Sequence, residues 1–140
     1  MFPWEITSLH PLFIHFPIAL LSTSVLFDIL GVLFRNKSLH YAGWWCLLVG
    51  VISSLAAIAT GFIADSIYGH MANPIPLFQT HGVVQLLASF MFIGLLIWRI
   101  KEKTELPVKP ILFFYLGLSG VAVMILFYGA HLGAHLAGRF

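Results

Sequence analysis

The stretch HPLFIHFPIALLSTSVLFDILGVLF, from His10 to Phe34, decides the fold of this chain. From Pro11 onward it is an almost unbroken apolar run, interrupted deep inside by one carboxylate, that of Asp28, and it is long enough to cross a bilayer as a helix. A strand is excluded because the run is too long and too continuous. The stretch therefore predicts a membrane helix, but one that opens with two histidines.

The composition of the whole chain indicates the same class. Of its 140 residues, 60% are hydrophobic and 9% are charged, whereas soluble domains have about 25% charged residues. The net charge of +2 gives no sign of nucleic-acid binding. The single cysteine, Cys46, excludes an intramolecular disulfide and the CxxCH motif of covalently bound haem. We expect one integral membrane domain over residues 1–140, without a cleaved signal peptide.

Four segments have the length and hydropathy of spans, at about 11–34, 41–68, 81–98 and 110–137. Their short connections predict an all-α, antiparallel up-down four-helix bundle. Lys and Arg concentrate in two connections, RNKSLH (35–40) and RIKEKTELPVK (99–109), and Arg99 is counted here as a connection charge. These connections are expected in the cytoplasm, which places both termini outside the cytoplasm.

This topology brings six of the seven histidines to the outer membrane face, and only His40 is expected in a cytoplasmic loop. The six are His10, His15, His70, His81, His131 and His135. Polar residues within spans are costly and mark functional sites. For Asp28, deep in the first span, the expected partners are Ser53, Ser54 or a water molecule. The histidines therefore predict a binding centre near the outer face.

The spacing of the histidines leaves the geometry of that centre open. His131 and His135 are four residues apart, so they share one helix face and can bind a small ion together or serve two centres. His10 and His15 are five apart. Either the helix begins at Pro17 as its first residue, or Pro17 kinks a helix that begins at Pro11.

Imidazole binds haem iron as well as copper, zinc and nonhaem iron. The aromatic surroundings and the scarcity of carboxylates favour haem b, one or two per chain. The expected ligand pairs are His15 with His131, and His81 with His135. His10 and Asp65 are expected to orient imidazoles or contact propionates, with His70 as a further candidate. A copper, zinc or iron ion held by the same histidines is the alternative.

The run HPLFIHFPIA, from His10 to Ala19, resembles a family of small four-span bacterial membrane proteins known as domain of unknown function 2231. The chain is also similar to this family at ATGFIAD (59–65), at His81 and at GAHLGAHL (129–136), where Ala134 replaces a glycine of the family pattern. The resemblance implies a bacterial inner membrane protein. It also implies redox work, because some relatives are fused to cytochrome c or Rieske-like domains.

Together these observations predict a membrane b-type cytochrome-like protein that transfers electrons, more a subunit than a self-contained enzyme. Its expected partners are a larger redox complex, quinone or a c-type cytochrome, and a homo-oligomer is left open. A protein that handles copper, zinc or iron is the second hypothesis. A structural or pigment-binding subunit is the third. No nucleophile–base pair and no nucleotide-binding loop stands in the sequence.

Overall fold

The computed structural model describes residues 6–68 and 80–136, with side chains described for residues 13–63 and 80–135. Within these ranges the chain forms four helices: α1 (Ile6–Phe34), α2 (Lys37–Tyr68), α3 (His81–Lys101) and α4 (Ile111–Leu136). All four are long and apolar enough to cross a membrane. The expected all-α membrane fold with four spans is confirmed.

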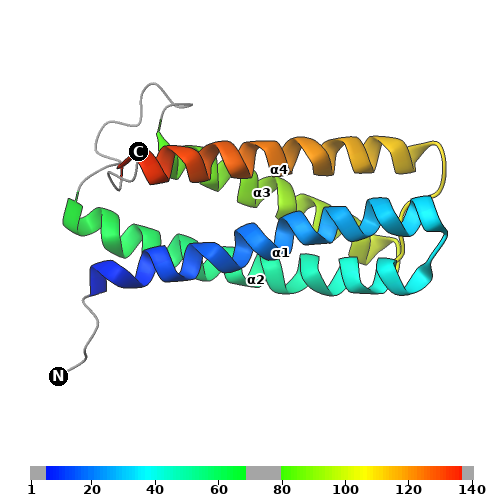
Figure 1. Cartoon of the computed structure of the whole chain (residues 1–140), viewed down its shortest axis with the longest axis horizontal. Coiled ribbons are helices and arrows are strands. Elements are labelled where there is room, and N and C mark those ends of the chain that lie inside the picture. Colours follow the sequence, from blue (N-terminus) through cyan, green and yellow to red (C-terminus); the bar gives the residue numbers. More distant parts are fainter. Residues whose placement is uncertain (1–5, 69–79, 137–140) are drawn as a thin grey trace.

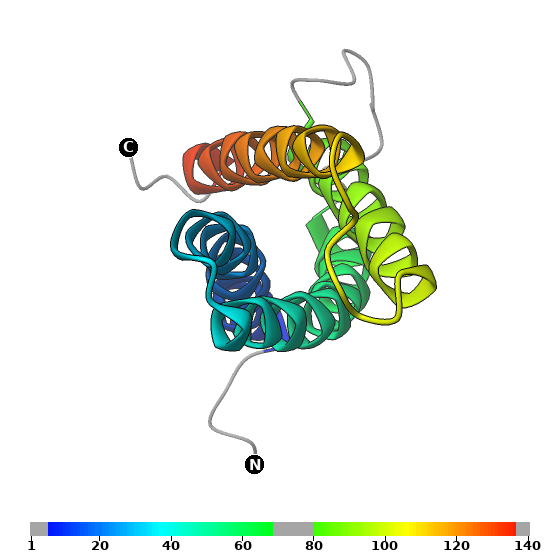
Figure 2. The same cartoon turned by 90° about the vertical axis from the view of Figure 1, so that its right-hand side faces the viewer.

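The helices form an antiparallel bundle in which each helix lies beside its neighbours in sequence and α4 returns to α1 (Figures 1 and 2). The connections at 35–36 and 102–110 lie at one end, which we call the loop end (Figure 1). The start of α1, the start of α3 and the end of α4 lie at the opposite end. We call this the histidine end, because His15, His81, His131 and His135 lie in those helix segments.

The core of the bundle is an apolar column to which all four helices contribute. Leu21, Leu47, Phe92 and Leu126 are at most 3% exposed, and Tyr115 is 1% exposed. The apolar faces that point away from this column carry large exposed side chains over most of the length of every helix. Such outward faces are expected where lipid, rather than water, surrounds the bundle.

Helices α1 and α2 approach each other most closely, and glycines allow it. A side chain at Gly50 would lie 2.7 Å from Leu21, and one at Gly31 would lie 2.6 Å from the imidazole of His40. Small residues at such contacts permit the close backbone approach that drives helix association in membranes. The same logic applies between α3 and α4, where Gly129 packs against Gln85 and Gly133 against His81.

Two sequence-based expectations about helix ends are wrong. Helix α1 does not begin at Pro17 or Pro11 but at Ile6, and it continues through both prolines. Proline costs a helix one N–H, but the apolar surroundings and the length of the span favour continuation over a break. Helix α2 begins at Lys37, so His40 is a helical residue and not a loop residue.

Candidate functional site

The best-defined pair of histidines at the histidine end lies on α4. His131 and His135 are one helical turn apart, with ring centroids 4.7 Å apart and ring planes at 89°. Both side chains are exposed, and they lie within the last two turns of a helix that ends at Leu136. Two imidazoles that bind one ion at 2.0–2.1 Å have centroids about 5 Å apart. The observed spacing therefore suits joint binding of one small ion.

The same geometry excludes these two histidines as the axial pair of one haem. Axial ligands approach iron from opposite sides of the macrocycle, so the whole porphyrin would have to lie between them. The side chains of His131 and His135 project from the same face of one helix, and their rings are in contact. A haem at this end would need a ligand from another helix.

His81 lies on the other side of α4. Its Nδ1 is 2.6 Å from the carbonyl oxygen of Gly129, and the ring covers Gly133, where a Cβ would lie 2.6 Å from Cε1. His131 and His135 each follow one of these glycines by two residues, which on a helix is about 200° of rotation. The structure therefore separates His81 from the exposed pair, although all three lie at the same end of the bundle.

The contact with Gly129 fixes the tautomer of His81. A carbonyl oxygen only accepts hydrogen bonds, so Nδ1 carries the proton and donates it. In the neutral ring the lone pair is then on Nε2. Histidines that bind metals commonly have this arrangement, with the second nitrogen held by a backbone carbonyl. Next to it, the amide of Gln85 donates weakly to the carbonyl of Leu126, at 3.4 Å.

His15 lies about nine residues into α1 and is exposed. It lines a shallow, open hollow of about 270 Å³ together with Phe16, Ala19 and Leu20. An apolar hollow of this size is below the usual range of small-molecule sites. No described contact joins His15 to His131, so their pairing stays a prediction.

The remaining candidates lie outside the described side chains. His10 and Asp65 fall in the ends of α1 and α2 whose side chains are not described, and His70 lies outside the described residues altogether. Among the residues that the structure describes, no three His, Cys, Asp or Glu side chains are grouped so that they could hold one metal ion. The pair on α4 is therefore the best candidate centre.

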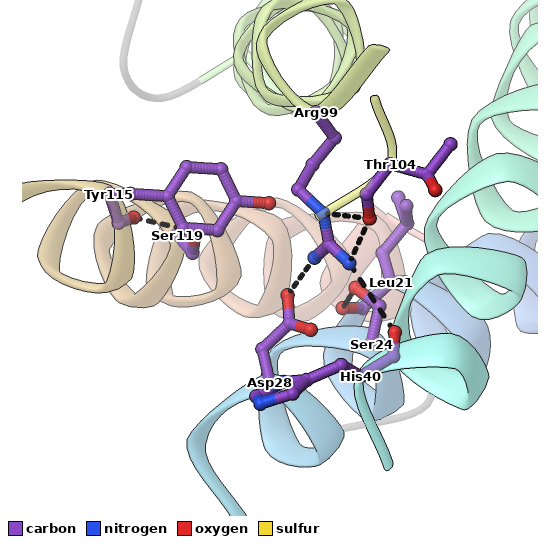
Figure 3. Close-up of polar contacts among 8 residues, drawn as sticks. All are labelled: Leu21, Ser24, Asp28, His40, Arg99, Thr104, Tyr115 and Ser119. Carbon is purple, nitrogen blue, oxygen red and sulfur yellow. Dashed lines mark hydrogen bonds and ion pairs between the residues drawn. The ribbon is translucent and has the colours of Figure 1, made fainter. Parts of the chain in front are cut away.

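The loop end contains a second polar site that the sequence analysis missed. We call it the polar cluster, and it comprises Asp28, His40, Arg99, Thr104 and Tyr115 (Figure 3). The guanidinium Nη1 of Arg99 donates to Asp28 Oδ2 at 2.7 Å, and the two side chains are 0% and 3% exposed. This finding corrects two expectations. Arg99 is not a connection charge but part of α3, and the described partner of Asp28 is this arginine rather than Ser53 or Ser54.

Arg99 connects several segments at once. Its Nε and Nη2 donate to the carbonyl of Thr104 at 3.2 and 3.0 Å, and Nη2 also donates to the carbonyl of His40 at 3.3 Å. The hydroxyl of Tyr115, on α4, points toward the guanidinium (Figure 3). The two serines proposed for Asp28 instead donate to carbonyls of their own helix. One side chain thus joins α1, α2, α3 and the connection to α4.

A signal for this cluster is present in the sequence. The buried positions Val84, Ala88, Phe92 and Leu95 on α3 follow one another at steps of three or four residues. Arg99 is the next position of this series, so the helical period places it on the core face. A charge on that face and a carboxylate deep in another span each require a partner.

Comparison with known proteins agrees with the fold. Residues 7–140 match the family described as "Predicted membrane protein (DUF2231)". The chain belongs to this family. The match extends from the start of α1 to the end of the chain, so the resemblance seen at His10–Ala19 holds for all four helices. No curated protein and no solved structure matches the chain. Family membership supports a multi-pass membrane protein and carries no description of its chemistry.

Proposed function

We propose that this DUF2231 protein binds a transition-metal ion at the histidine end, through His131 and His135. The observation that carries the proposal is the exposed i, i+4 pair with its 4.7 Å ring spacing. Neutral imidazole is a common ligand of copper, zinc and iron ions. The protein would be a metal-handling component of the bacterial inner membrane.

The position of the pair suits exchange with an aqueous compartment. His135 is one residue from the end of α4, and His131 is about 7.5 Å from that end along the helix axis. The described loop end carries the exposed cations Arg35, Lys37, Lys101, Lys103 and Lys109. Arg99 is buried and does not belong to this group, but the remaining Lys and Arg residues still concentrate at the loop end. This asymmetry supports a cytoplasmic loop end and an outward-facing histidine end.

The first experiment is metal analysis of the purified, detergent-solubilised full chain. We expect a stoichiometric copper, zinc or iron ion, or uptake of one added equivalent of copper(II) or zinc(II). His131→Ala and His135→Ala should each weaken the binding by at least about tenfold, since each removes one of the two proposed ligands. Tyr128→Phe, an exposed position one turn earlier on α4, is the matched control and should bind normally. Equal binding by all four proteins would refute the proposal.

Haem b is the second candidate, and a separate observation favours it. The Nδ1 of His81 is held by a backbone carbonyl, as is common in histidines that bind metals, and Nε2 would be the atom that holds the haem iron. His15 or a histidine outside the described side chains would provide the second ligand. Bound haem would supply one-electron chemistry with quinone, a c-type cytochrome or a larger redox complex.

A reduced-minus-oxidised spectrum distinguishes the two candidates. Sharp α and β bands that His81→Ala abolishes, and that His131→Ala and His135→Ala leave unchanged, would favour haem over the ion site. A colourless protein that binds metal in stoichiometric amount would favour the ion site. If no preparation contains metal or pigment, the result would favour a structural subunit.

A further inference from the structure

The carboxylate of Asp28 is buried with one oxygen uncompensated. Oδ2 accepts from Arg99, whereas Oδ1 is buried and has no hydrogen-bond partner in the described part of the chain. The nearest hydroxyl on the same face of α1, that of Ser24, already donates to the carbonyl of Leu21 at 2.8 Å. A buried carboxylate oxygen normally accepts hydrogen bonds, so this oxygen indicates a ligand site.

The space at Oδ1 limits what that ligand can be. A Cβ at Gly43 would lie 2.5 Å from Asp28 Oδ1 and 3.1 Å from the carbonyl oxygen of Ser24. The backbone of α2 therefore closes this side of the carboxylate too tightly for a methyl group. A proton is the ligand that fits. Once bound, it makes Oδ1 a hydrogen-bond donor.

The hydrogen bonds of Arg99 allow the polar cluster to accept this proton without losing any of them. Three of its described hydrogen bonds go to neutral carbonyls, two to Thr104 and one to His40. The fourth goes to Oδ2, which still accepts after Oδ1 is protonated. Proton binding therefore adds one positive charge to the cluster while every described hydrogen bond to Arg99 can persist.

We propose that Asp28 is a proton-binding site at the loop end, taking up one proton on Oδ1. No other bond forms or breaks, and the proton comes from the water beside the loop end. His40 is partly exposed, and its Nδ1 is buried without a described partner against Gly31, which follows Asp28 by three residues on α1. The titratable and charged groups that face the cluster are His40 and Cys46 on α2, Arg99 on α3, Glu105 in the connection and Tyr115 on α4.

The chain has two aspartates, Asp28 and Asp65, which makes a direct test practical. In Asp65→Asn protein labelled with ¹³C-aspartate, the single carboxyl carbon signal in NMR belongs to Asp28. We expect this signal to move from the carboxylate to the carboxylic-acid position as the pH falls, while circular dichroism shows that the helices persist. The matched control is Asp28→Asn protein, in which the signal reports Asp65 alone.

Gly43→Ala supplies a second readout. Its Cβ would lie 2.5 Å from Oδ1, so the protonated carboxyl group no longer fits against α2, and we expect the proton affinity of Asp28 to fall several-fold. A signal that stays at the carboxylate position throughout the folded range would overturn the proposal. So would a transition that coincides with loss of helix, or one that Gly43→Ala leaves unmoved in folded protein. The proposal does not depend on the metal site at the histidine end.

Discussion

Replacing Arg99 by methionine is expected to destabilise the protein strongly. The substitution keeps a long apolar stem but leaves the buried carboxylate of Asp28, whose side chain is 3% exposed, without its counter-charge. Removing one partner of a buried ion pair costs about 3–5 kcal/mol. The carbonyls of Thr104 and His40 lose their donor as well, which puts the expected loss at the upper end of that range.

The decisive comparison is a double mutant. Asp28→Asn alone should destabilise the protein, because it removes the counter-charge of a buried guanidinium. The same change in the Arg99→Met background should stabilise it by about 2 kcal/mol or more, because it neutralises an uncompensated buried carboxylate. The assay is equilibrium unfolding in SDS, followed by tryptophan fluorescence. Lys101→Met, exposed two residues later on α3, should change the free energy of unfolding by less than about 0.5 kcal/mol.

The reasoning fails if Arg99→Met and Lys101→Met unfold alike, or if Asp28→Asn has the same sign in both backgrounds. Additive effects would mean that the pair contributes no coupling energy, and that the contacts of Arg99 with backbone carbonyls account for its burial.

Three further predictions concern glycines and the connection after α3. Gly43→Ala should lower the free energy of unfolding by about 1–3 kcal/mol, because its Cβ would lie 2.5 Å from a buried oxygen. Gly117→Ala has nothing within 4 Å, so it should be neutral or stabilise by up to about 1 kcal/mol. Unfolding in SDS compares the two variants. Gly133→Ala should displace the ring of His81, visible as a shifted imidazole resonance in ¹⁵N NMR, and an unmoved resonance would contradict the packing described. Thr104→Gly should stabilise by about 1 kcal/mol, since Thr104 has φ of 70° and its described hydrogen bonds are made by its backbone N–H and carbonyl, which glycine retains; a loss of stability would show that its side chain matters.

The four spans, their antiparallel order and the grouping of histidines at one end were predictable from the sequence. Long apolar runs determine the spans, and short connections determine which helices are neighbours. The spacing of His131 and His135 likewise predicted a shared helix face, and the structure confirms it with rings in contact.

The direction of each polar side chain around its helix was harder to predict. Which face of α4 meets α3 depends on Gly129 and Gly133, and that contact sends His131 and His135 outward and leaves His81 on the opposite side. The positive charge of Arg99 predicts a solvent-exposed connection, although its position in the helical series places it in the core. Burial of an arginine depends on a partner from a distant span, which local pattern does not supply.

The site at the histidine end is tested most directly by electron paramagnetic resonance of the copper(II)-loaded protein. Nitrogen couplings in the spectrum count the imidazoles bound to the ion. We expect couplings from two imidazoles in the unmodified protein and in Tyr128→Phe, and the loss of one imidazole in each of His131→Ala and His135→Ala. A copper spectrum that neither histidine variant changes would contradict the assignment of the metal site to this pair.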